Sequence, residues 1–132
     1  MLNREKTTGP NGWQVWLEII HGLMPRQDDV AEQVAQYQAI AHAKAVVSPS
    51  GFRMLRDKLG LKPPEVTKRI AVARKADLFI RFAKNVPPVL STQYELRVLD
   101  DSVFEGLIAD KRIHRNLTAR EARQIADSYG HK

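Results

Sequence analysis

The segment from Phe52 to Lys75, FRMLRDKLGLKPPEVTKRIAVARK, decides the fold, because it has the pattern of two short helices joined by a sharp turn. The turn is predicted at Gly60, since glycine adopts positive φ without a steric penalty. The double proline after it suits the first turn of a helix, where a missing N–H has no partner to lose. We therefore predict a helix-turn-helix over 52–75, with apolar inward positions at Leu55, Leu59, Leu61, Val66 and Ile70.

The second helix of this unit is predicted to have two different sides. If it opens at Pro64, one side carries Val66, Ile70 and Ala73, which face inward. The other side is polar and basic and is the one that a DNA major groove would meet. It carries Thr67, Lys68, Ala71, Arg74 and Lys75.

The spacing of the apolar residues resembles a known family. Leu61 follows Gly60, Val66 comes five residues after the leucine, and Ile70 and Val72 follow at four and then two residues. This frame is similar to the helix-turn-helix of ParB and KorB partition and repressor proteins. The resemblance covers residues 52–75 and implies that helix 64–75 is a recognition helix. The nucleotide-binding region of partition proteins has no counterpart, so no cofactor is expected.

Arg56 departs from the family pattern, which usually has a small residue at that position. We expect its stem to lie along apolar surface with its charged head in water. Residues 90–125, LSTQYELRVLDDSVFEGLIADKRIHRNLTAREARQI, resemble the C-terminal portion of small phage and plasmid proteins. This second resemblance implies a phage or plasmid setting.

The positive charge is concentrated around the predicted motif. Residues 44–84 hold 11 Lys or Arg and 3 Asp or Glu, a net charge of +8, whereas the rest of the chain holds 10 and 12, a net charge of −2; together these give the +6 of the chain. Such concentration is typical of a surface that binds a polyanion. A solvated basic face without a ligand is the alternative.

The leading hypothesis is sequence-specific binding of double-stranded DNA by a transcriptional repressor or a partition-type regulator. Base contacts are predicted from Thr67, Lys68 and Ala71, and phosphate contacts from Arg53, Lys62, Arg74 and Lys75. Because one such motif buries limited area, we expect a homodimer on an inverted repeat. The stripe of Trp13 and Trp16, or the last helix, would supply the contact between the two copies.

The competing hypothesis is an anti-defence protein, similar in role to an anti-CRISPR, that blocks a host nucleoprotein complex. The same basic belt could cover a nucleic-acid channel or an acidic protein surface, since a fold does not fix a function.

Composition places the chain among ordinary globular proteins. Its 132 residues, 43% of them hydrophobic and 27% charged, suit one domain, which we place at 13–132 after a flexible tail at 1–12. No apolar run approaches the roughly 20 residues of a membrane helix, so no membrane partner is expected. The absence of cysteine excludes disulfides and thiolate ligands. A cytoplasmic, nucleoid-associated location follows as an expectation.

The rest of the chain is predicted to be helical as well, since no stretch alternates convincingly with period two. We predict an all-α fold, a compact bundle of six to eight short helices. Asp28, Ser50, Asp100 or Asp101 are the predicted N-caps, and Thr92 with Glu95 (Ser91 competing) and Thr118 with Glu121 are predicted capping boxes. Helices are expected over 13–23 and 28–47, as a pair within 52–75, and over 78–84, 92–99, 101–108 and 118–129.

Residues for catalysis or metal binding are not evident. The four histidines, His21, His42, His114 and His131, lack the spacing of a zinc motif, and no phosphate-binding or nucleophile motif occurs. Asp100 and Asp101 are adjacent at a helix start, where aspartates act as caps. His114 lies in a basic turn and is predicted to be solvated or to touch phosphate. We expect a binding protein rather than an enzyme, with no metal site.

Overall fold

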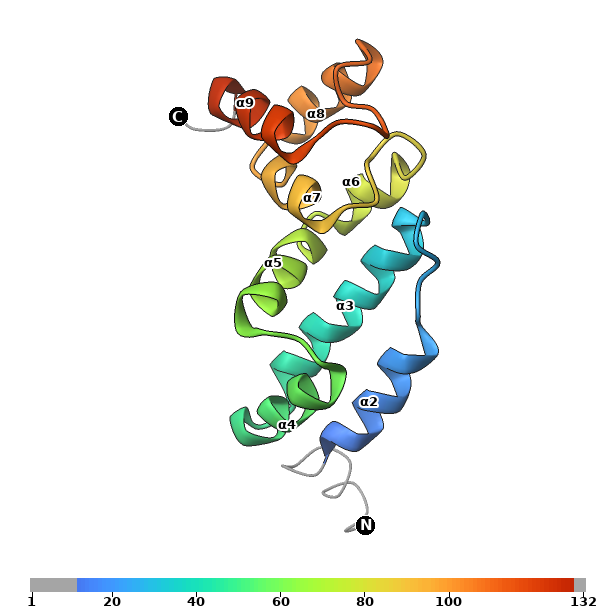
Figure 1. The fold of residues 1–132 in the computed structure, drawn as a ribbon, viewed down its shortest axis with the longest axis vertical. Coiled ribbons are helices and arrows are strands. Elements are labelled where there is room, and N and C mark those ends of the chain that lie inside the picture. Colours follow the sequence, from blue (N-terminus) through green and yellow to red (C-terminus); the bar gives the residue numbers. More distant parts are fainter. Residues whose placement is uncertain (1–11, 130–132) are drawn as a thin grey trace.

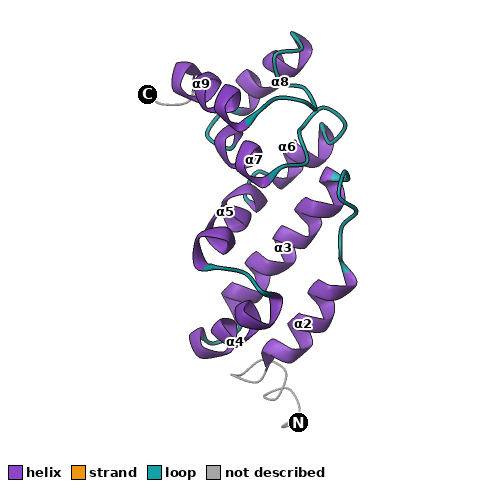
Figure 2. Ribbon diagram, viewed as in Figure 1, coloured by secondary structure: helices purple, strands orange, loops and turns teal. Residues whose placement is uncertain are grey.

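The protein is all-helical, as predicted. A computed structural model describes residues 12–129, and these residues form eight helices and no strand (Figures 1 and 2). The predicted tail at 1–12 lies outside the described residues apart from Gly12, as does the chain after Tyr129. The helices are α2 (Trp13–Gly22), α3 (Val30–Val46), α4 (Pro49–Leu59), α5 (Pro63–Ala73), α6 (Ala76–Arg81), α7 (Leu90–Leu96), α8 (Asp101–Ala109) and α9 (Ala119–Tyr129).

Helices α3 and α5 lie side by side along the molecule and belong to both of its cores (Figure 1). At one end α3 packs with α2 and α4, and at the other α3 packs with α6 and α5 packs with α7, on which α9 packs in turn. The first core, which we call the α2–α4 core, contains Ile20, Ile40, Ala43, Val47, Phe52, Leu55 and Val66. The second, the C-terminal core, includes Val30, Val34, Tyr37, Val72, Phe79, Leu96, Phe104 and Ile125.

Two predicted N-caps are wrong by one or two residues. Asp29, not Asp28, caps α3, and its Oδ1 accepts a 2.9 Å hydrogen bond from the Glu32 N–H. Ser48, not Ser50, caps α4, and its Oγ accepts a 3.1 Å bond from the Gly51 N–H. The reason in α4 is Pro49, whose fixed φ suits the first helical position and places the cap immediately before it.

The turn between α4 and α5 has the predicted glycine but different helix limits. Gly60 has φ 73°, and the Leu61 N–H behind it donates a 3.1 Å bond to the Arg56 carbonyl, which closes α4. Helix α5 opens at Pro63 rather than Pro64 and ends at Ala73. The expected helix end at Lys75 is therefore wrong, because the chain turns at residues 74–75 before α6 begins.

Local capping patterns succeed in α9 and fail in α7. In the predicted box of α9, the Glu121 N–H donates to Thr118 Oγ1 at 3.1 Å and the Thr118 N–H donates to Glu121 Oε1 at 3.0 Å. The predicted box of Thr92 and Glu95 does not form, because α7 already begins at Leu90 and Thr92 is buried. Asp100 stands at the N-cap of α8 without a side-chain cap bond, and Asp101 binds Lys75 instead.

A buried polar network fixes α7 against α3. The Tyr37 hydroxyl donates to Gln93 Oε1 at 3.2 Å, and Gln93 Nε2 donates to Gln33 Oε1 and to the Pro87 carbonyl, both at 3.0 Å. Burial raises the pKa of Tyr37, so its hydroxyl stays protonated and remains a donor at neutral pH. The network holds α7 in the position from which it reaches the exposed side of α5.

Within residues 12–129, no helix combines the length and the apolar character needed to cross a lipid bilayer.

Candidate nucleic-acid interface

The three predicted base-contact residues lie on α5 and differ in how exposed their side chains are. Thr67 is exposed, and its Oγ1 donates a 3.1 Å hydrogen bond to the Pro63 carbonyl one turn earlier. Lys68 is half-buried, with Nζ 5.5 Å from the centroid of the Tyr94 ring on α7. Ala71 is half-buried beside them. Only Thr67 therefore presents its side chain freely to solvent.

The predicted phosphate contacts divide into three free cations and one that is paired. Arg53, Lys62 and Arg74 are exposed, and their side chains form no ion pair within residues 12–129, although the Glu65 carboxylate accepts a 2.8 Å hydrogen bond from the backbone N–H of Lys62. Lys75 instead donates a 2.8 Å hydrogen bond from Nζ to Asp101 Oδ1 on α8, and its side chain is only 26% exposed. This bond lowers the pKa of the Asp101 carboxyl. Lys75 thus differs from the other three in that its ammonium group already binds a carboxylate.

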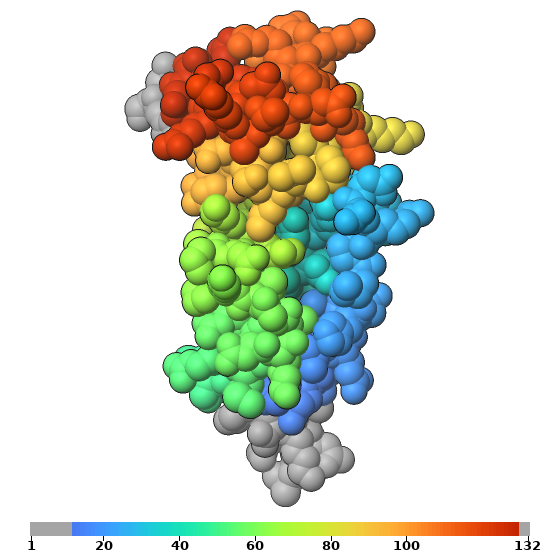
Figure 3. Space-filling view, in the orientation of Figure 1, coloured from blue at the N-terminus to red at the C-terminus, as the bar shows by residue number. Residues whose placement is uncertain are grey.

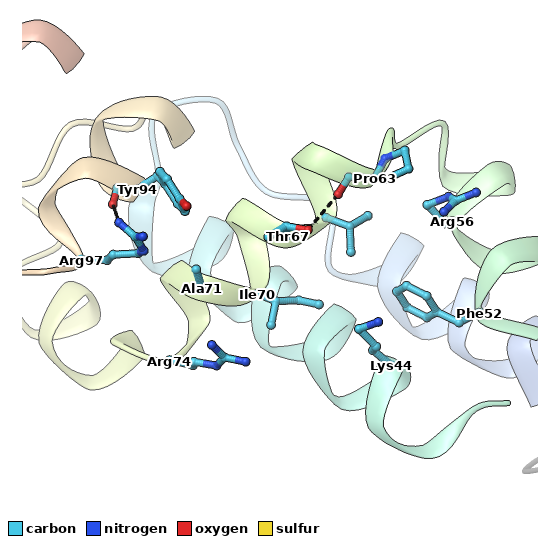
Figure 4. A pocket seen from close by; sticks show the side chains of 11 residues that line it. Lys44, Phe52, Arg56, Pro63, Thr67, Ile70, Ala71, Arg74, Tyr94 and Arg97 are labelled. Carbon is cyan, nitrogen blue, oxygen red and sulfur yellow. Dashed lines mark hydrogen bonds between the residues drawn. The ribbon is translucent and has the colours of Figure 1, made fainter. Parts of the chain in front are cut away.

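A groove of about 410 Å³ runs along the exposed side of α5 (Figure 4). Val66, Ile70 and Ala71 of α5 line it, and α3, α4 and α7 contribute side chains around its rim. None of its lining residues is acidic. The cations that line it are Lys44, Arg56, Arg74 and Arg97, and the aromatic residues are Phe52 and Tyr94.

Arg56 joins this groove by lying along its wall. Its side chain is 25% exposed, its Nε is buried without a hydrogen-bond partner, and its Nη2 lies 3.3 Å from Asp57 Oδ1. The stem is therefore covered while the head remains at the rim. This placement explains how an arginine fits where the resemblance expects a small residue.

The ion pairs are distributed unevenly over the molecule. Arg26 pairs with Asp29 and Glu32, Lys75 with Asp101, and Arg81 with Glu105. Among the residues of α4, α5 and the groove, the structure records only the 3.3 Å contact of Arg56 with Asp57. The surfaces of α4 and α5 form a continuous band along one long side of the molecule (Figure 3). This band carries positive charge that the protein itself leaves largely uncompensated.

Sequence reasoning missed the three groove residues that lie outside the 52–75 motif. Lys44 comes from the end of α3, and Tyr94 and Arg97 come from the end of α7. None of them belongs to a local motif with α5, because α5 meets them only through tertiary packing. The basic character of Arg97 was visible in the sequence, but nothing near it indicated its neighbours.

The tryptophans predicted for self-association are partly covered. Trp13 and Trp16 pack against the α2–α4 core, and the Trp16 ring lies 5.0 Å from the ring of His42. The exposed apolar residues Val15 and Ile19 of α2 and Leu23 at its C-cap recur every fourth residue and so share another side of the helix.

The described residues contain no cluster of three or more histidine and carboxylate side chains that could hold a metal ion. His114 is exposed, and its Nδ1 accepts a 3.2 Å bond from the Asn116 N–H. This contact gives His114 a role in the turn before α9.

No family model, curated protein or solved structure matches this chain. The interface is therefore interpreted from its own geometry.

Proposed function

We propose that this protein binds double-stranded DNA in a sequence-specific manner through the α4–α5 pair, as a repressor or a partition-type regulator. The observation that carries the proposal is the band of cations along α4, α5 and the groove, which lacks acidic partners except at Arg56. Unpaired cations on one face attract a polyanion because binding releases the counterions of its phosphates. The resemblance of residues 52–75 to the ParB and KorB helix-turn-helix supports the same class.

The proposed role of each residue follows from how exposed its side chain is and from whether another residue already binds it. Arg53, Lys62 and Arg74 hold phosphates, and Thr67 and Ala71 face base edges. Lys68 reaches a base only by leaving the Tyr94 ring, which costs about 0.5–1 kcal/mol for an exposed cation–π contact. We assign no DNA contact to Lys75, because Asp101 already binds it.

Thr67 is expected to read a base through its acceptor and methyl groups. Its hydroxyl proton is committed to the Pro63 carbonyl, which leaves the oxygen lone pairs for an amino group of adenine or cytosine. Thr67→Val keeps the methyl group and replaces the hydroxyl by a second methyl, which removes this acceptor, so discrimination at one base pair should fall by about 1 kcal/mol, roughly fivefold. Fluorescence anisotropy with duplexes that differ at single base pairs measures the change. Thr67→Ser keeps the hydroxyl and is the matched control, so it should keep the base-pair preference. An equal loss of preference in both variants would mean that the shape of the Thr67 side chain, and not its hydroxyl oxygen, reads the base.

Arg74→Ala is expected to weaken binding to every duplex by a similar factor, because a phosphate contact carries no sequence information. The slope of log affinity against log salt should become shallower by about 0.9. Salt titrations of the same anisotropy assay measure the slope. Lys84→Ala removes an exposed charge outside the α4–α5 pair and serves as control. A loss confined to one sequence would instead make Arg74 a base contact.

Selection of bound DNA from a random pool tests the proposal as a whole. A defined motif supports sequence-specific binding, and an inverted repeat supports the predicted homodimer. Failure to bind mixed-sequence DNA at low salt contradicts the proposal. A pull-down from nuclease-treated host lysate addresses the anti-defence alternative, which a protein partner that persists without DNA would support.

A further inference from the structure

Arg97 at the end of α7 is held in place before any ligand arrives. Its guanidinium carbon lies 3.7 Å from the centroid of the Tyr94 ring, and its Nη1 donates a 2.8 Å hydrogen bond to the Tyr94 carbonyl. No carboxylate among residues 12–129 pairs with it. These contacts fix the plane of the guanidinium and leave its remaining N–H groups free for an anion.

Arg97 occupies one end of the groove, and a second set of cations occupies the other. Arg97 lies near Ala71 and Arg74, whereas Arg56 lies beyond Pro63 at the opposite end of α5 (Figure 4). Lys62 stands at the N-cap of α5 and Arg74 at its C-cap. The 11 residues of α5 lie between these two, so Lys62 and Arg74 are twelve residue steps apart, which corresponds to about 18 Å along the axis.

This spacing is larger than the width of the major groove of double-stranded DNA. The major groove of B-DNA is about 12 Å wide between its two sugar–phosphate backbones. When α5 enters the groove with its axis inclined to the groove direction, cations about 18 Å apart along the helix can therefore reach opposite backbones. The cations at the N-terminal end of α5 would meet one strand, and those at the α7 end would meet the other.

We infer that α7 is a second anchor for the DNA backbone, in which Arg97 binds a phosphate of the strand opposite to the one held by Arg53 and Lys62. This inference rests on the proposed binding of double-stranded DNA by α5. Phosphate is the fitting ligand because a planar guanidinium donates two parallel N–H bonds to its oxygens. Tyr94 is a positioning residue, since it acts through Arg97.

Replacing Arg97 tests this anchor. For Arg97→Ala, we expect the affinity for the selected duplex to fall roughly 5- to 10-fold near 0.1 M salt, and the salt slope to fall by about 0.9, as for one lost phosphate contact. The preference among sequences should not change. Arg97→Lys keeps the charge without the planar fork and should recover part of the affinity. Arg120→Ala, which removes an exposed charge on α9 outside the groove, should stay within about twofold because screening weakens distant charges.

Ethylation interference then assigns the strand. In the wild type, ethylated phosphates on both strands at the edges of one major groove should block binding. Arg97→Ala should relieve the block on one strand and Lys62→Ala on the other; relief on the same strand would overturn the inference. Circular dichroism and thermal unfolding confirm that each variant is folded.

The inference and the proposed function fail in different ways. If the wild type binds no duplex, the proposed function is wrong and the anchor with it. If the wild type binds and Arg97→Ala binds with the same affinity and salt slope, the anchor alone is wrong. If the groove binds an acidic peptide instead of DNA, the wild type should bind no duplex. It should then bind poly-glutamate, and Arg97→Ala should abolish that binding.

Discussion

Phe104→Ala is expected to lower the free energy of unfolding by about 3–5 kcal/mol, the range for removing a buried phenylalanine ring. Phe104 is 0% exposed in the C-terminal core, and its ring centroid lies 5.5 Å from that of Phe79 and 6.0 Å from that of Phe82. The substitution therefore leaves a cavity between α6 and α8 and removes two ring contacts. Urea denaturation followed by circular dichroism measures the loss.

The neighbouring Val103 provides the control for Phe104. Val103 is only half-buried, so Val103→Ala removes less buried surface and should cost clearly less than Phe104→Ala. Domains of this kind are stable by about 5–15 kcal/mol, so the Phe104 variant should lose a large share of the total free energy of unfolding. A loss under 1 kcal/mol would mean that the C-terminal core does not depend on this ring.

Gln93→Leu is expected to lower the free energy of unfolding by about 2–4 kcal/mol, although leucine is the more apolar residue. Gln93 is 0% exposed and joins Tyr37, Gln33 and the Pro87 carbonyl by three hydrogen bonds. Leucine would leave these groups unpaired in the interior, and each buried unsatisfied group costs about 1–3 kcal/mol. The same denaturation experiment applies.

An exposed glutamine provides the control, because it shows how replacing glutamine by leucine changes stability where no buried hydrogen bond is lost. Gln38→Leu makes the same replacement on the surface of α3 and should change stability by no more than about 0.5 kcal/mol. In the proposed function, Gln93→Leu should also weaken DNA binding, because α7 would no longer hold Tyr94 and Arg97 beside α5. A stability equal to or above that of the wild type would show that the network is not needed to hold α7.

Local signals in the sequence predicted much of the fold. The helical class, the glycine turn at Gly60 and the capping box of Thr118 and Glu121 depend on neighbouring residues only, and the structure confirms them. The box of Thr92 and Glu95 failed for a tertiary reason. Thr92 is drawn into the interior together with Gln93, whose hydrogen bonds reach α3 and the Pro87 carbonyl, so Thr92 cannot stand at a solvent-facing helix start.

In the candidate site, too, features that depend on local sequence were predicted and contacts between distant segments were not. Arg53, Lys62 and Arg74 were predicted as phosphate contacts from their places on the first helix and at the ends of the second, and all three are exposed. The environment of Lys75 could not be predicted, because its partner Asp101 lies 26 residues further along the chain. For the same reason, no local pattern indicated that Arg97 and Lys44 line one groove with α5, since only the packing of α3 and α7 on α5 brings them together.

The sharing of α3 and α5 between two cores has a practical consequence for anyone who shortens this chain. A fragment cut after Lys75 would keep every residue of the predicted motif, yet Val30, Val34 and Tyr37 would lose the helices that shield them from water. Those newly exposed apolar side chains favour aggregation of the fragment over correct folding. Expression of the intact chain is therefore the sound starting point for any binding assay.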